Sequence, residues 1–374
     1  MTPPRERLHY IDNLRVLLTF LVILHHSAEA WTTGPHSVTG HTINPLMNLL
    51  CGINGSFCMG TFFLVSGYFH PPALARKGTW PFIHDRFMRL ALPALVYSFT
   101  IRPLQWYFIE YVVDGTTPNP GIIGSLPNFF WDHYGFSHLW FLLVLFFFGI
   151  GYALLDRTWK RFSPITPKWA NPETVGIQRL LIAVLAVYML ASFVVRIKFE
   201  PNAWIRLPWP VSVRAAHVPQ YVFMFALGLY AYYGQLFKKL TVRTGVVWTI
   251  IAFIPTIIFT PIFRVDAYLG WGWNITGVVS TIRETVMCVG ISIGLVVLFR
   301  EKFNMTGTVL RFLRRTAYAA YIVHLPIVFV FQYLVLDWPL NPLLLFMVVG
   351  GATLTLTFAI SALLVRLPGV RSVL

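Results

Sequence analysis

Residues 10–27 combine ionisable side chains with an apolar run of helical length: Asp12 and Arg15 lie at one end, and His25 and His26 at the other. Ionisable side chains are costly inside a membrane helix, so they indicate function there. Arg15 and His26 are eleven residues apart, which corresponds to three helical turns plus about 20° and to a rise of about 16 Å. We therefore predict that these two side chains share one helix face, whereas His25 points about 100° away from it.

His26 is the stronger candidate for catalysis in this helix, and His25 is the lesser one. A neutral imidazole is suited to act as general base on a hydroxyl because it titrates near working pH. Asp12 precedes Arg15 by three residues, a spacing that lets a carboxylate orient a guanidinium on the same helix face. The alternative for His26 is a structural hydrogen bond to a neighbouring helix.

Two further groups lie near the ends of the next apolar runs. Ser66 and Gly67 are small residues that let a helix or a slender ligand approach the backbone closely, and packing alone explains them equally well. Arg86 and Arg89 have the i, i+3 spacing that puts two guanidiniums on the same side of a helix start. Such a pair forms a fork for phosphate groups, unless it only sets topology.

His138, Trp140 and His324 are weaker candidates for contact with a second substrate. His138 lies at the expected outer start of an apolar run beside Trp140, where an interfacial histidine is commonly an anchor. His324 comes shortly before Pro326, whose missing N–H leaves a backbone carbonyl free in the preceding turn. A structural hydrogen bond is at least as good an explanation of His324 as a substrate contact.

Composition assigns these residues to a membrane protein. The chain of 374 residues is 56% hydrophobic and 11% charged, whereas an ordinary soluble domain has about 25% charged residues. A bilayer core of about 30 Å requires about 20 apolar residues per helix. Ten apolar runs meet this length and predict an all-α integral membrane protein of about ten transmembrane helices. The runs lie near 14–33, 45–69, 88–112, 138–155, 178–195, 217–236, 245–263, 282–299, 317–337 and 341–364.

The formal net charge of +15 indicates topology and not nucleic-acid binding, and we expect no nucleic-acid partner. Lys and Arg are concentrated in alternate loops, and the loops 34–44, 113–137 and 338–340 contain none. By the positive-inside rule, the basic loops and both termini are predicted to be cytoplasmic. The basic residues of these loops include Arg5, Arg7, Arg76, Lys77, Arg86, Arg89, Arg157, Lys160, Arg161, Lys168, Arg179, Lys238, Lys239, Arg243, Arg300, Lys302, Arg311, Arg314, Arg315, Arg366 and Arg371.

Five basic residues depart from this pattern, because the predicted topology places them outside. They either face an anionic acceptor, contact lipid headgroups, or lie in a solvated loop. These residues are Arg196, Lys198, Arg206, Arg214 and Arg264.

The organisation of the chain predicts a single transmembrane domain over residues 1–374, since no repeat occurs and no loop exceeds about 25 residues. Residues 1–30 imitate a signal peptide, but their ionisable residues favour a retained helix. The three cysteines lack metal-ligand spacing, so we expect core residues and no metal site. They are Cys51, Cys58 and Cys288.

Taken together, these pieces resemble the acyltransferase-3 family of membrane-bound acyltransferases over nearly the whole chain. The resemblance implies a ten-helix domain that moves an acetyl or succinyl group from cytoplasmic acyl-CoA to a carbohydrate hydroxyl on the far side. In appearance the chain is most similar to the glucan succinyltransferase branch, which has no appended esterase-like domain. The motifs are Arg15 and His26 with ten residues between them, residues 62–68, the pair Arg86 and Arg89, residues 137–142, and residues 321–326.

The resulting hypothesis is a multi-pass O-acyltransferase of the cell inner membrane with no bound cofactor. Acyl-CoA is the donor substrate, and an extracytoplasmic glycan and membrane lipid are the expected partners. Arg86 and Arg89 would hold the phosphates, Arg15 would guide the pantetheine, and His26 would act as base or transient acyl carrier. The rival interpretation is a transporter or flippase for a glycan or an anionic substrate, because buried charges also suit that class.

Overall fold

The computed structural model describes residues 8–33, 38, 42–115, 119–162, 176–206, 211–263 and 270–370. Five of the basic residues named above lie outside this part: Arg5, Arg7, Lys168, Arg264 and Arg371. The described chain is almost entirely helical, which confirms the all-α prediction. A short antiparallel pair of strands, β1 (Trp204–Arg206) and β2 (Ser212–Arg214), precedes α8 and aligns Ile205 with Val213.

The helices follow the apolar runs of the sequence, because each run satisfies its backbone polar groups internally. They are α1 (His9–Ala28), η1 (Glu29–Trp31), α2 (Pro45–Lys77), α3 (Thr79–Arg86), η2 (Phe87–Ala91), α4 (Leu92–Tyr107), η3 (Phe108–Val113), α5 (Gly121–Asn128), η4 (Phe129–His133), η5 (Ser137–Leu139), α6 (Trp140–Phe162), α7 (Ile177–Arg196), η7 (Ala215–His217), α8 (Val218–Tyr233), α9 (Leu236–Lys239), α10 (Val242–Phe263), α11 (Ile275–Lys302), α12 (Thr308–Leu334) and α13 (Pro342–Leu364).

Eight helical segments of the described chain are long and apolar enough to cross a membrane by length and composition. Two of the ten expected spans are not among them. In one, residues 88–112, α4 is flanked by the π-helical turns η2 and η3. In the other, residues 217–236, α8 has only 16 residues. The number of crossings and the side of each terminus stay predictions.

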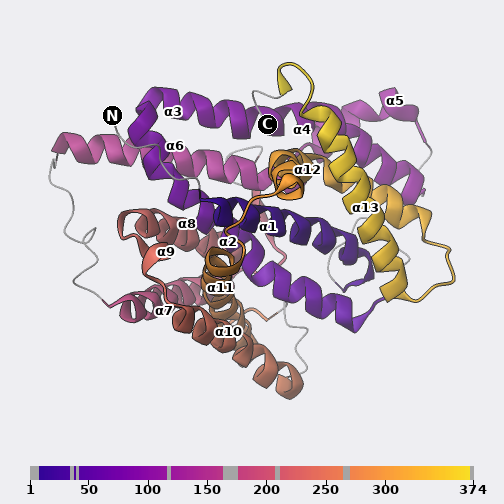
Figure 1. Cartoon of the computed structure of the whole chain (residues 1–374). Helices are drawn as coiled ribbons and strands as arrows, with labels where there is room; N and C mark the ends of the chain where they lie inside the picture. The colour runs from indigo at the N-terminus through magenta and orange to yellow at the C-terminus, as the bar shows by residue number, and fades with distance from the viewer. Residues whose placement is uncertain are drawn as a thin grey trace.

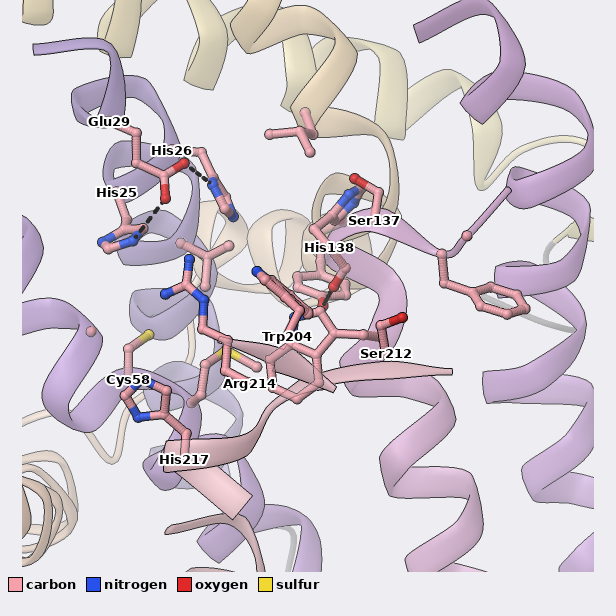
Figure 2. Close-up of a pocket in the computed structure, with 18 of the residues that line it drawn as sticks. His25, His26, Glu29, Cys58, Ser137, His138, Trp204, Ser212, Arg214 and His217 are labelled. Carbon is pink, nitrogen blue, oxygen red and sulfur yellow. Dashed lines mark hydrogen bonds and ion pairs between the residues drawn. The ribbon is translucent and has the colours of Figure 1, made fainter. Parts of the chain in front are cut away.

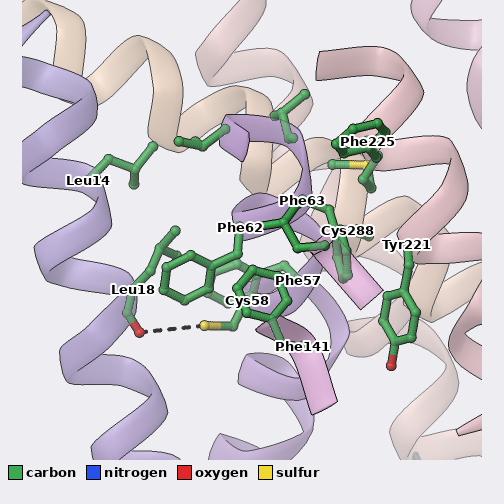
Figure 3. Packing of buried hydrophobic residues seen from close by; sticks show 14 of the residues in the cluster. Leu14, Leu18, Phe57, Cys58, Phe62, Phe63, Phe141, Tyr221, Phe225 and Cys288 are labelled. Carbon is green, nitrogen blue, oxygen red and sulfur yellow. Dashed lines mark hydrogen bonds between the residues drawn. The ribbon is translucent and has the colours of Figure 1, made fainter. Parts of the chain in front are cut away.

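Helix α1 lies in the middle of the bundle and packs against α2, α11, α12 and α13 (Figure 1). Its apolar face carries Leu14 and Leu18, both fully buried, towards Phe62 and Cys58 of α2 (Figure 3). The Cys58 thiol lies 3.7 Å from the carbonyl oxygen of Leu18, so this cysteine is part of the core. The central position of α1 explains how both ends of one helix can border cavities enclosed by the others.

Helices α2 and α8 approach each other at Gly67 and Gly228. A Cβ atom on Gly67 would lie 2.3 Å from the carbonyl oxygen of Phe225, and one on Gly228 would lie 2.2 Å from that of Leu64. Two glycines therefore permit backbone contact between these helices. Packing, one of the two explanations left open by the sequence, accounts for Gly67.

Candidate active site

Among the described helices, Tyr321 of α12 lines two cavities. The first, of about 710 Å³, is the histidine-lined cavity; it is bordered by His25, His26, Glu29 and His138 (Figure 2). The second, of about 540 Å³, is the arginine-rich cavity; its lining includes the basic residues Arg15, Arg76, Lys77, Arg86, Arg89 and Arg314. The opposite ends of α1 thus border different cavities, with Arg15 in one and His26 in the other.

The arginine-rich cavity brings together most of the residues predicted to bind a donor. Asp12, Arg15, Ser66, Arg86 and Arg89 all line it, although they come from three separate stretches of sequence. Gly67 does not line it, because its surface is covered by α8. The predicted pairing of Asp12 with Arg15 stays a prediction. Several cations around one space create a strong field for a polyanionic ligand.

Arg86 and Arg89 have different surroundings within the arginine-rich cavity. Arg89 lies in the π-helical turn, with its side chain 53% exposed and Nε 3.1 Å from the Asp85 carboxylate. Arg86 is the last residue of α3; its guanidinium lies 5.0 Å from the centre of the Phe82 ring, and its Nε is buried without a hydrogen bond. The pair is therefore inside a continuous helical segment and not at a helix start, and Arg86 is also a packing residue.

Asp85 holds two of the cations in this cavity. Its carboxylate lies 2.6 Å from Nζ of Lys77 and 3.1 Å from Nε of Arg89. Partial burial raises the pKa of the Asp85 carboxyl, but the hydrogen bond and charge of Lys77, together with Arg89, hold that pKa below its ordinary value. Asp85 is thus ionised at neutral pH and restrains Lys77 and Arg89 without neutralising all the positive charge around them.

In the histidine-lined cavity, Glu29 fixes the orientation of His26. Nδ1 of His26 lies 2.6 Å from Oε2 of Glu29. Because a carboxylate only accepts hydrogen bonds, Nδ1 carries the proton of this contact, and in the neutral imidazole Nε2 then has the free lone pair. A carboxylate that holds an imidazole in one tautomer is the arrangement found in general bases. The contact with Glu29 is thus of the kind that general-base chemistry at His26 would use, and the catalytic role of His26 stays a prediction.

His25 lies beside the same carboxylate. Its Nε2 is 3.4 Å from Oε1 of Glu29, and its Nδ1 is buried without a hydrogen bond. Both histidines border the cavity. The 3₁₀ turn that begins at Glu29 places its carboxylate next to both of their side chains. The helical-face argument alone does not separate them, so the ranking of His26 above His25 stays a prediction.

His138 and Tyr321 hold each other by reciprocal hydrogen bonds. The Tyr321 hydroxyl donates to the carbonyl of His138 over 2.6 Å, and Nε2 of His138 donates to the carbonyls of Tyr321 and Ile322, each over 3.1 Å. The Ile322 carbonyl is the one that Pro326, four residues later, cannot bond. The free carbonyl predicted from Pro326 is thus used by His138 of another helical segment.

His324 lies behind the cavity wall. Its Nδ1 donates to the Tyr321 carbonyl over 2.7 Å, and the residue has no exposed surface. Its ring centre is 4.7 Å from that of His138 and 5.4 Å from that of His26. Nε2 of His324 and Nδ1 of His138 are both buried without a hydrogen bond. The structural role foreseen for His324 is present, and Trp140 lines the cavity near His138.

Several residues of the histidine-lined cavity are not among those predicted from sequence. Glu29 had a signal, since it follows His26 by three residues, and Tyr321 opens the motif at residues 321–326, whereas nothing in the sequence pointed to Arg102. Arg214, one of the basic residues expected outside, also borders this cavity. In the described part of the chain, no group of three or more His, Cys, Asp or Glu residues is arranged to hold a metal ion.

Comparison with known proteins places this chain in a family. A family model described as an acyltransferase domain matches residues 8–362, which is nearly the whole chain. The chain belongs to the acyltransferase-3 family. It is therefore a multi-pass membrane acyltransferase, and the family resemblance of its motifs is confirmed.

The curated relatives that carry a protein name are only distantly similar in sequence. The acyltransferase is 25% identical over 199 residues to proteins named "Glucans biosynthesis protein C" from Salmonella paratyphi A (strain ATCC 9150 / SARB42) and Salmonella agona (strain SL483). The match covers 52% of this chain and 50% of each relative, so the chain spans about half the length of the curated relatives it matches. No solved structure matches it.

Proposed function

We propose that this acyltransferase moves an acetyl or succinyl group from cytoplasmic acyl-CoA to a hydroxyl of an extracytoplasmic carbohydrate, in the cell inner membrane. The observation that carries the proposal is the pair of cavities that share Tyr321 as a lining residue. One has the cations suited to a phosphorylated donor, and the other has the Glu29–His26 pair suited to a base.

The donor half of the mechanism uses the arginine-rich cavity. Arg86 and Arg89 bind phosphate oxygens of CoA by charge-assisted hydrogen bonds. Arg15, on α1, guides the pantetheine arm towards Tyr321. From Arg15 to His26 the helical rise is about 16 Å, so an extended arm between these residues brings the thioester to the histidine-lined cavity.

The chemical step uses His26. Nε2 accepts the proton of an acceptor hydroxyl, and the hydroxyl oxygen attacks the thioester carbonyl to form the new C–O bond. Collapse of the tetrahedral intermediate breaks the C–S bond, and the imidazolium returns its proton to the CoA thiolate. Direct attack by His26 followed by transfer from an acyl-imidazole is the second route, and the same variant tests apply to both.

The acceptor is proposed from the relatives. Their name assigns them to glucan biosynthesis. The volume of the histidine-lined cavity, about 710 Å³, is in the range of small-molecule sites. Aromatic side chains such as Trp140 and Trp204 border it and suit the apolar faces of sugar rings. A carbohydrate hydroxyl is thus the acceptor that fits both observations.

The decisive experiment measures acyl transfer by the purified full-length protein. Detergent-solubilised protein is incubated with acetyl-CoA or succinyl-CoA carrying a labelled acyl group, with and without glucan oligosaccharides, and free CoA thiol and labelled glycan are followed. We expect thiol release that depends on His26, with label on the glycan. If wild-type protein releases no thiol from either donor but moves labelled glycan across proteoliposomes, the transporter interpretation replaces this proposal.

A further inference from the structure

Two arginines reach the histidine-lined cavity from different parts of the chain. Arg102 comes from α4 and Arg214 from the end of β2. Each guanidinium lies over an aromatic ring, Arg102 at 5.8 Å from the centre of Phe129 and Arg214 at 5.4 Å from that of Trp204. In Figure 2, Arg214 points into the space that His25 and Glu29 also face.

Neither arginine has a carboxylate partner in the described part of the chain. No ion pair joins Arg102 or Arg214 to an acidic residue there, and the Nε atom of each is buried without a hydrogen bond. Both side chains are only partly exposed, and the buried Nε of each has lost water without gaining an acceptor, so attraction to a counter-charge would stabilise these cations. The rings beneath the guanidiniums supply part of that attraction but no hydrogen-bond acceptor.

The nearby carboxylates are already engaged. Glu29 contacts His26 and His25, as described above. Glu284 of α11 forms an ion pair with the fully buried Arg196, and its other oxygen lies 2.8 Å from Nδ1 of His217. His217 ends η7, the turn that follows β2, so Glu284 anchors the segment that carries Arg214 while its own charge is engaged by Arg196 and His217.

The direction in which the donor is proposed to enter indicates which part of a substrate reaches Arg102 and Arg214. An acyl-CoA that enters from the arginine-rich cavity stops with its reacting carbonyl at His26. The acyl chain beyond that carbonyl must then project away from CoA, into the histidine-lined cavity. The acceptor occupies the same cavity, so an anionic group of either substrate enters a space whose lining includes Arg102 and Arg214.

We infer that Arg102 and Arg214 form an anion subsite that selects substrates carrying a carboxylate. The carboxylate belongs either to the distal end of the transferred acyl group or to an acidic sugar of the acceptor. A guanidinium binds such a group through two parallel hydrogen bonds. The catalytic use of the subsite rests on the proposed acyl transfer, whereas its capacity to bind an anion does not.

The first test measures binding without turnover. Thermal unfolding midpoints of purified full-length protein are recorded against succinate and glucuronate, with succinamide and glucose as neutral counterparts, at constant ionic strength. We expect the midpoint to rise with at least one anion and with neither neutral compound. Arg102→Gln and Arg214→Gln should each weaken the response at least about tenfold in ligand concentration, and Arg214→Lys should retain part of it.

Lys198→Gln is the matched control, because it removes the same charge from an exposed residue that does not line the cavity. It should leave the midpoint response unchanged. The inference is wrong if neither anion raises the wild-type midpoint, or if the response of both Gln variants equals that of wild type. An anion response in a protein that releases no CoA thiol supports the subsite and removes only the proposed function.

The second test identifies the source of the carboxylate. The kcat/KM ratio for succinyl-CoA over acetyl-CoA is measured with a neutral acceptor, and the ratio for methyl glucuronide over methyl glucoside is measured with acetyl-CoA. A tenfold fall of the first ratio in the Gln variants assigns the subsite to the acyl group, and the same fall of the second assigns it to the acceptor. Equal losses for charged and neutral substrates would overturn selection by charge.

Discussion

Glu29 contacts two adjacent histidines of α1: Oε2 lies 2.6 Å from Nδ1 of His26, and Oε1 lies 3.4 Å from Nε2 of His25. One carboxylate therefore orients two imidazoles on the same cavity wall. The shorter contact goes to His26, so the tautomer of His26 is the more firmly fixed. This difference separates the two histidines experimentally.

His26→Ala should lower kcat by roughly 10²- to 10⁴-fold, because a general base contributes about that much. Donor affinity should be kept, since the phosphates are expected at Arg86 and Arg89, in the cavity at the Arg15 end of α1, and Arg15 is about 16 Å from His26 by helical rise. Single-turnover kinetics and CoA binding measure the two effects separately. His25→Ala serves as the neighbouring control and should be milder. An inactive His25→Ala beside a nearly normal His26→Ala would transfer the catalytic role to His25.

Glu29→Gln tests the orienting carboxylate without changing side-chain size. An amide can donate to or accept from Nδ1 of His26, so the productive tautomer is no longer imposed. We expect kcat to fall at least about tenfold while CoA affinity stays within twofold, as for other residues that orient a functional histidine. Glu29→Asp, which keeps the charge, should recover part of the loss. Full activity of Glu29→Gln would show that Glu29 is only a structural partner.

Arg86→Ala and Arg89→Ala should both weaken acyl-CoA binding, by about 1.5–3 kcal/mol for each lost charge-assisted contact. Their effects on stability should differ. Arg89 is half-exposed, so its loss should leave the unfolding midpoint nearly unchanged. Arg86 packs on Phe82, so its loss should lower the unfolding midpoint. Calorimetric titration with CoA and thermal unfolding measure these quantities. Unchanged CoA affinity in the double variant would assign the pair to topology alone.

Gly67→Ala should destabilise the fold by about 1–3 kcal/mol, the usual cost of overpacking. The added Cβ would lie 2.3 Å from the Phe225 carbonyl oxygen, so α2 and α8 would have to separate. Gly151→Ala is the control, because a Cβ there meets no atom within 4 Å. Thermal unfolding in detergent compares the two. Equal stability of both variants would show that the close contact of α2 and α8 is not required.

The predicted orientation can be tested by cysteine labelling. The natural cysteines, Cys51, Cys58 and Cys288, are all buried and should label slowly. New cysteines at Arg157 and Lys302 should react with an impermeant maleimide only from the cytoplasmic side, and one at Ile123 only from outside. The three positions are exposed, so failure to react reflects the membrane and not burial. A reversed pattern would reverse the direction proposed for acyl transfer.

The sequence by itself determined the class of the protein and the first members of its site. Long apolar runs and alternate basic loops are local properties of the sequence. In lipid such runs form helices, because a helix satisfies its own backbone hydrogen bonds. The spacing of Arg15 and His26 follows from helical periodicity, so their separation along α1 was also predictable. Glu29 was within reach of the same reasoning, because an i, i+3 neighbour of His26 lies on the same side of the turn.

Only the tertiary structure decided how the ends of α1 are enclosed. His138 and Tyr321 are 183 positions apart, and Arg102 and Arg214 lie in different helical and strand segments. Their meeting depends on the packing of side chains between helices, which local sequence does not encode. Gly67 illustrates the same limit, since a small residue equally suits a ligand and a helix until its neighbour is known. Packing against Gly228 settled that choice.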